Sequence, residues 1–115
     1  MLVNLLDNLR VNNLIRQAEW CPDPTQQPSL SFRGNELAGE VGEACNVIKK
    51  IERAANGWRG SKDTIEHLTE ELADVIICVD LIAMRFHIDL SEAVIKKFNA
   101  TSEKYGLKTM MERVV

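Results

Sequence analysis

Apolar residues recur at helical spacing along most of the chain, and no segment shows the strict alternation of apolar and polar residues typical of a half-buried strand. Prolines, glycines and capping residues interrupt this pattern and divide the chain into four segments. We expect helices over about residues 2–20, 31–55, 61–86 and 90–105. Ser31 is the expected N-cap of the second helix, and Gly106 is expected to end the fourth. The sequence therefore predicts an all-α fold class with a four-helix arrangement.

The length of 115 residues and 13.0 kDa predicts a single domain over residues 1–115, because two separate cores would each be too small to bury themselves. Hydrophobic residues make up 45% of the chain and charged residues 27%, which is the balance of a soluble globular protein. Fourteen basic and seventeen acidic residues give a net charge of −3, so we expect no binding to a nucleic-acid polymer. The longest apolar stretch, residues 75–84, is short and contains Asp80, so we expect no membrane span.

The three cysteines are widely spaced and form no CxxC motif. Their odd number argues against a disulfide framework, and their spacing argues against a zinc site. Cys45 and Cys78 lie inside apolar helical patterns, so we expect reduced, buried thiols in a cytoplasmic protein. The N-terminus carries no basic region and no cleavage site, so no secretory signal is expected.

The third predicted helix is apolar over most of its circumference. One broad apolar face consists of Leu68, Leu72, Val75, Ile76, Val79, Ile82 and Ala83. Ile77 and Leu81 lie well round the helix from this face. A helix that is apolar on most sides must be covered on most sides, and a bundle of this size can hardly surround it. We therefore expect a homo-oligomer, either a dimer or a tetramer, in which a partner subunit covers the remainder.

Three acidic residues share one arc of the second predicted helix. Glu36, Glu40 and Glu43 fall at positions i, i+4 and i+7, and Lys50 returns to the same arc. The arc lies beside the apolar stripe that is expected to face the core, which consists of Leu37, Val41, Ala44, Ile48 and Ile51. For Glu40 and Glu43 alone, the simpler interpretation is a solvated helix face.

Two further acidic residues lie inside the third helix, the most apolar of the four. Glu71 and Asp74 are three residues apart and share an arc with His67 and Cys78. Apolar residues flank this arc on both sides. A buried carboxylate without a partner is costly enough to shift its pKa or to require a counter-charge. The basic residues on matching arcs are too few to neutralise four or five acids.

A divalent cation would neutralise these acids, because carboxylate oxygens are the ligands that Mg²⁺ and Mn²⁺ prefer. If the second and third helices pack antiparallel, the ExxE pattern of residues 40–43 faces the ExxD pattern of residues 71–74, and four carboxylates converge. This convergence favours a magnesium site, with Mn²⁺ as a second suitable ion. A di-iron site would require Glu-x-x-His twice, and neither His67 nor His87 follows a Glu by three residues.

The segment Glu36-Leu-Ala-Gly-Glu40-Val-Gly-Glu43-Ala44, followed by Glu71-Leu-Ala-Asp74-Val75, resembles the signature of the MazG-like nucleotide pyrophosphohydrolases. These proteins belong to the all-α NTP pyrophosphohydrolase superfamily, together with the dimeric dUTPases and the dCTP pyrophosphatases. Their signature is ExxE, a spacer and ExxD, and here 27 residues separate Glu43 from Glu71. The resemblance extends over residues 31–106, and residues 97–106 look like the basic C-terminal helix of the family.

The resemblance implies a MazG-like bundle and the Mg²⁺-dependent hydrolysis of a nucleoside triphosphate between its α- and β-phosphates, for nucleotide-pool house-cleaning or regulation. By their match to the motif, the implied metal ligands are Glu40, Glu43, Glu71 and Asp74. Glu40 or Glu43 would also orient or deprotonate the attacking water. Many members read Glu-Glu-x-x-Glu, whereas this chain has Gly39 in place of the first Glu, and Glu36 is the candidate replacement.

The residues that would bind the substrate are less constrained by the sequence. The resemblance implies that the triphosphate contacts Lys97 and Lys104, and Lys50 is a further candidate. Lysines in such positions also commonly extend into solvent. On the first helix, polar side chains beside a tryptophan that could stack on a base suggest a nucleobase pocket, formed by Asn13, Arg16 and Trp20. The alternative for the tryptophan is a core or interface position.

Two other functions are compatible with this pattern. One is a catalytically silent helical module for oligomerisation or regulation, which would need neither Glu71 nor Asp74. The other is a nucleotide sensor, which would keep the carboxylates but release no pyrophosphate. Metal-dependent release of pyrophosphate distinguishes the enzyme from both.

Overall fold

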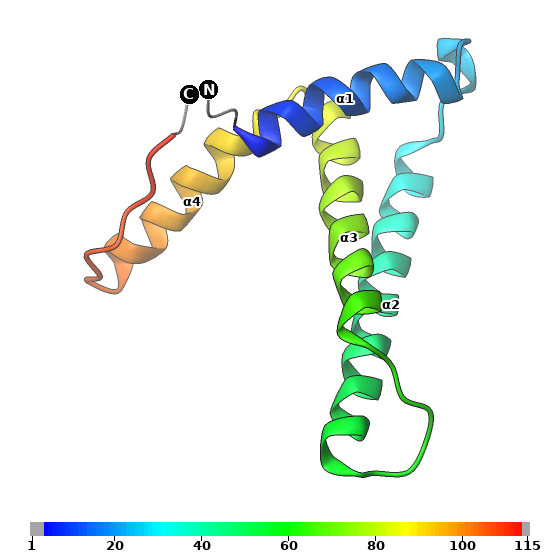
Figure 1. Ribbon diagram of the computed structural model, residues 1–115. Coiled ribbons are helices and arrows are strands. Elements are labelled where there is room, and N and C mark those ends of the chain that lie inside the picture. Colours follow the sequence, from blue (N-terminus) through cyan, green and yellow to red (C-terminus); the bar gives the residue numbers. More distant parts are fainter. Residues whose placement is uncertain (1–3, 114–115) are drawn as a thin grey trace. The chain divides into compact units, whose positions relative to one another are not determined.

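The computed structural model describes residues 4–113, and these residues form four α-helices, one short 3₁₀ helix and no strand (Figure 1). The helices are α1 (Leu5–Trp20), η1 (Pro24–Gln26), α2 (Leu30–Asn56), α3 (Ile65–Arg85) and α4 (Leu90–Lys104). The predicted all-α class and the predicted four helices are thus confirmed. Residues 2 and 3 of the predicted first helix lie outside the described residues. No helix within residues 4–113 is long and apolar enough to cross a lipid bilayer.

Polar side chains at the helix starts explain where the helices begin. The second helix begins earlier than predicted, because Ser29 rather than Ser31 is its N-cap and accepts a hydrogen bond from the Phe32 amide at 3.1 Å. The third begins later, after Thr64, whose hydroxyl accepts from the His67 amide at 3.2 Å. At the other end of the chain, Gly106 follows α4 with a φ of 66°, as predicted.

The chain forms two compact units. One unit, here called the hairpin unit, is residues 28–82 and contains α2 and most of α3. The other, here called the terminal unit, comprises residues up to 27 together with residues from 83 onwards, and contains α1, the end of α3 and α4. In the hairpin unit α2 and α3 lie side by side and run in opposite directions, so the condition under which the ExxE and ExxD patterns face each other is met (Figure 1).

The core of the hairpin unit is small and differs in part from the predicted stripe. Ala44 and Val47 of α2 and Cys78 of α3 are buried. Val41 and Ile48 of the predicted stripe are instead 42% and 47% exposed. The reason is that α3 packs against the side of α2 that carries Ala44 and Val47, so the stripe is turned partly away from the contact.

The three cysteines are free, as predicted, but only one of the two cysteines that we expected to be buried is buried. Cys78 is buried, whereas Cys45 is exposed. Cys45 follows the buried Ala44 directly, and successive residues of a helix point about 100° apart, so its side chain leaves the face that α3 covers.

In the terminal unit α1 contacts α4, and the C-terminal segment forms hydrogen bonds with side chains of both helices. The buried Ser91 hydroxyl donates to Asp7 Oδ1 at 2.9 Å. Arg113 binds Asp7 through Nη2 and Asp89 through Nη1, each at 2.9 Å. Asn99 exchanges two hydrogen bonds with the backbone of Met111, at 2.7 and 3.0 Å, so residues 107–113 run back beside α4 (Figure 1).

Candidate metal centre

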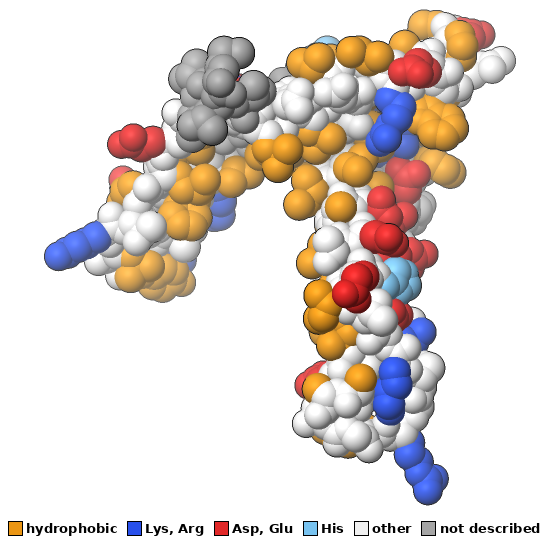
Figure 2. Space-filling view, viewed as in Figure 1, with side chains coloured by type: hydrophobic (Ala, Val, Ile, Leu, Met, Phe, Trp, Pro, Cys, Tyr) orange, Lys and Arg blue, Asp and Glu red, His pale blue; other side chains and the backbone are white. Residues whose placement is uncertain are grey.

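Three carboxylates converge in the hairpin unit. Glu40 and Glu43 project from α2 and Glu71 projects from α3, and one oxygen of each lies within 4.8 Å of the other two. Glu40 and Glu71 are half-buried and Glu43 is exposed. Figure 2 shows acidic side chains along one edge of this hairpin, with a histidine among them. We call Glu40, Glu43 and Glu71 the carboxylate cluster.

Asp74, the fourth predicted ligand, lies outside this group of three. Its side chain is exposed, one turn along α3 from Glu71. Its charge nevertheless raises the pKa of both Glu40 and Glu43, and its role as a metal ligand stays a prediction.

Two oxygens of the carboxylate cluster are shielded from solvent and lack a hydrogen-bond partner among the described residues. They are Glu40 Oε2 and Glu71 Oε2. A buried acceptor without a donor costs free energy, so such groups usually have a partner of some kind. Several carboxylate oxygens converging on one point form the donor set that suits a hard divalent cation such as Mg²⁺ or Mn²⁺. The residues present therefore fit the predicted metal.

The electrostatics of the carboxylate cluster also favour added positive charge. Burial raises the pKa of Glu40, and the like charges of Glu43, Asp74 and Glu71 raise it further. The pKa of Glu43 is raised first by the hydrogen bond that its protonated form shares with Glu71, and then by the charge of Glu71. In both cases the surroundings disfavour the ionised form, and a bound cation would remove that penalty.

His67 contacts the carboxylate cluster through Glu71, although it lies outside the ExxE and ExxD motifs. Its Nδ1 lies 2.9 Å from Asp63 Oδ2 and its Nε2 lies 3.1 Å from Glu71 Oε1. The hydrogen bond with Asp63 is the main cause of a raised His67 pKa, and Glu71 adds to it. The four-residue spacing of His67 and Glu71 is the sequence signal for their contact, because i and i+4 side chains meet on a helix, whereas Asp63 precedes α3 and is placed only by the structure.

Glu36 has a different partner from the other acids of α2. Arg33 Nη1 donates to Glu36 Oε1 at 3.0 Å, and the Cys78 thiol lies 3.8 Å from the same oxygen. Burial, followed by the charges of Glu36 and Glu40, raises the pKa of Cys78 to about 11, so the thiol stays protonated at neutral pH. Glu36 as a replacement for an acid at Gly39 stays a prediction.

The predicted substrate-binding residues are distributed over both units. Lys50 is half-buried in the hairpin unit, and its charge helps to lower the pKa of Asp63. In the terminal unit α1 carries a buried Asn13 and exposed side chains of Arg16 and Trp20. The exposed Lys97 and Lys104 lie on α4. Their roles in substrate binding stay predictions.

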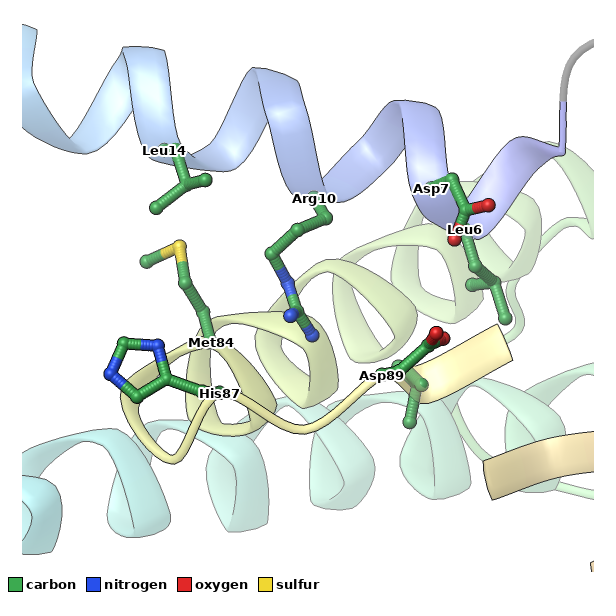
Figure 3. Close-up of a pocket in the computed structure, with 8 residues that line it drawn as sticks. Leu6, Asp7, Arg10, Leu14, Met84, His87 and Asp89 are labelled. Carbon is green, nitrogen blue, oxygen red and sulfur yellow. The ribbon is translucent and has the colours of Figure 1, made fainter. Parts of the chain in front are cut away.

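The terminal unit contains a cavity of about 400 Å³, within the usual size range of small-molecule sites (Figure 3). Its polar lining includes Asp7, Arg10, His87 and Asp89. No residue of the carboxylate cluster lines it, and both of its aspartates are already bound by Arg113. We therefore assign it no part in the chemistry of the cluster.

Comparison with known proteins gives matches of two kinds. Residues 31–105 match the family model described as the MazG nucleotide pyrophosphohydrolase domain. The chain is also similar to proteins named dCTP pyrophosphatase 1 from Rattus norvegicus and Mus musculus, each 35% identical over 72 residues. The alignments cover 60% of this chain and 41% of each relative, so the match spans less than half the length of these curated relatives. No solved structure matches the chain.

Proposed function

The chain belongs to the MazG nucleotide pyrophosphohydrolase family, and we propose that it hydrolyses a nucleoside triphosphate between the α- and β-phosphates. The products would be the nucleoside monophosphate and pyrophosphate. The observation that carries this proposal is the carboxylate cluster, in which Glu40 and Glu71 each hold a shielded oxygen without a hydrogen-bond partner among the described residues.

Glu40, Glu43, Glu71 and Asp74 would hold the metal, which we propose to be Mg²⁺, with Mn²⁺ as a substitute. When bound, this ion supplies positive charge that offsets the repulsion between the triphosphate and the carboxylates and stabilises charge on the leaving pyrophosphate. The chain's own acids orient the nucleophile. One water attacks the α-phosphorus, the bond to the bridging oxygen of the β-phosphate breaks, and a carboxylate accepts the proton of the water.

Glu43 is our candidate for this proton acceptor. Glu40 and Glu43 both belong to the carboxylate cluster, but Glu43 is exposed whereas Glu40 is half-buried with one oxygen shielded from solvent. An incoming water reaches an exposed carboxylate without displacing protein atoms, and this supports Glu43 over Glu40.

A deoxynucleoside triphosphate is the proposed substrate class, and dCTP is the first to test, because the similar rat and mouse proteins are named dCTP pyrophosphatase 1. We propose that the lysines at 50, 97 and 104 bind the triphosphate and that Asn13, Arg16 and Trp20 bind the base. Removal or regulation of nucleotides in a cytoplasmic pool is the proposed physiological role.

The proposed active form is a homo-oligomer in which residues 1–115 act as a single domain. The family match crosses the division between the two units at residues 82 and 83, which supports one functional domain. Large apolar side chains on α3 support a partner subunit, since Leu72 is 48% and Ile76 is 50% exposed.

The proposal is tested by measuring the products formed from a panel of NTPs and dNTPs, including dCTP, with Mg²⁺, with Mn²⁺ and with EDTA. We expect equal amounts of monophosphate and pyrophosphate with either metal and none with EDTA. Release of orthophosphate instead would overturn the proposed bond cleavage. Nucleotide binding with no product from any nucleotide would favour the sensor function.

A further inference from the structure

His67 of α3 lies between two carboxylates, one from Glu71 on the same helix and one from Asp63 in the segment just before it. One ring nitrogen, Nδ1, is 2.9 Å from Asp63 Oδ2, and the other, Nε2, is 3.1 Å from Glu71 Oε1. A carboxylate oxygen can only accept hydrogen bonds, so a ring nitrogen that carries a hydrogen donates to the acid it faces, and the tautomer decides which nitrogen that is in the neutral ring. Both ring nitrogens thus face an acid, and the contact with Asp63 sets the orientation of the ring relative to Glu71.

The two oxygens of Glu71 have different surroundings. Oε1 contacts His67, whereas Oε2 is shielded from solvent and has no hydrogen-bond partner among the described residues. The Glu71 side chain is only 12% exposed, compared with 44% for His67. The imidazole therefore contacts one oxygen of this carboxylate. The other oxygen, which is shielded from solvent, is left for a cation bound by the carboxylate cluster.

We propose that His67 is a positioning residue that, held by Asp63, fixes the Glu71 carboxylate so that Oε2 is available to a divalent cation. This inference rests on the proposed metal-dependent function and adds a residue outside the ExxE and ExxD motifs. A hydrogen-bond partner behind a metal ligand sets the orientation of that ligand, and its removal typically weakens metal binding or activity about 10- to 100-fold.

The same contacts contribute little to the stability of α3. The contact with Glu71 joins side chains four residues apart on α3, and the contact with Asp63 joins His67 to the segment just before this helix; partly exposed pairs of this kind add only a small increment to stability. Loss of the imidazole should therefore change the affinity for metal much more than it changes folding. This separates a positioning role from a merely structural one.

The test is a calorimetric titration of the metal-free protein with Mn²⁺, which needs no substrate and no turnover. We expect His67→Ala to weaken Mn²⁺ binding about tenfold or more. His67→Gln keeps an amide N–H that can donate to Glu71, so its affinity should fall between the alanine variant and the wild type. Glu71→Gln should lose most of the binding, because it removes the charge of the ligand itself.

Glu70→Ala is the matched control, since Glu70 is an exposed acid directly before Glu71 and makes no described hydrogen bond or ion pair. It should bind Mn²⁺ like the wild type. Wild-type affinity in His67→Ala, or an equal loss in Glu70→Ala, would overturn the positioning role while the metal site itself stands. A wild-type protein that binds no Mn²⁺ would instead overturn the proposed function, and the positioning role with it.

Discussion

Glu40, Glu43 and Glu71 place like charges together, and the cost of this arrangement is expected to appear as a dependence of stability on pH. The pKa values of Glu40 and Glu43 are both raised. As the pH rises above about 4, these two carboxyl groups lose their protons in the unfolded chain but still hold them in the folded protein. The free energy of unfolding therefore falls as the pH rises from there through the raised pKa values. The raised pKa of His67 acts in the same direction, because the stabilisation by its partners is lost as the pH rises through that pKa.

We therefore expect the midpoint of thermal unfolding in EDTA to decrease between pH 5 and pH 8. Glu43→Gln removes one of the repelling charges and should make this decrease smaller. The same measurement with Mg²⁺ should restore the midpoint of the wild type at pH 8 more than that of the variant. Identical pH profiles for the two proteins would contradict the electrostatic account of the carboxylate cluster.

Substitutions at Gly39 separate an effect on helix stability from an effect on metal binding. No atom lies within 4 Å of the position that a Cβ would take, so Gly39→Ala should stabilise α2 by about 1 kcal/mol through helix propensity. Gly39→Glu should add the acid found in the signature that the chain resembles, and so lower the Mg²⁺ concentration needed for half-maximal activity. Gly39→Ala is its control, and an equal shift in both variants would argue against a role for the added carboxylate.

For whole elements, helix periodicity was sufficient to predict the four helices, whereas the antiparallel packing that brings the acids of α2 and α3 together entered the sequence analysis only as a condition. Helical spacing favoured the wrong valine of α2, because Val41 lies on the apolar stripe whereas Val47 lies on the arc that carries the acids Glu40 and Glu43. The structure buries Val47 and exposes Val41. The four-residue spacing of His67 and Glu71 permits their contact, and the side-chain positions show that it forms.

Ion pairs of Arg113 attach the C-terminal segment to α1 and to the N-cap of α4. Its guanidinium binds Asp7 and Asp89, and these contacts are exposed to solvent, so salt screens them. Arg113→Gln should lower the midpoint of thermal unfolding slightly at low ionic strength. The difference from the wild type should vanish in about 1 M salt, where the Debye length is near 3 Å. A difference that is independent of salt would assign the effect to packing instead.

At the scale of the whole molecule, the exposed apolar side chains of α3 predict self-association. Light scattering at micromolar concentration should give a mass of two or four times 13.0 kDa. Ile76→Glu places a charge on a half-exposed position and should shift the protein toward the monomer without loss of helix content. A monomeric wild type, or an unchanged mass for the variant, would contradict an interface at this face.

Hydrolysis of dCTP in oxygen-18 water shows which phosphorus the water attacks, and so tests whether the carboxylate cluster supports hydrolysis at the α-phosphorus. With Mg²⁺ we predict label in dCMP and none in pyrophosphate, because the attacking water joins the α-phosphorus. Glu71→Gln should abolish the incorporation while the protein remains folded. If dCTP is not the substrate, the best nucleotide of the panel replaces it. Label in pyrophosphate or orthophosphate would contradict attack at the α-phosphorus, and full activity in the variant would contradict the role of Glu71 in the metal site.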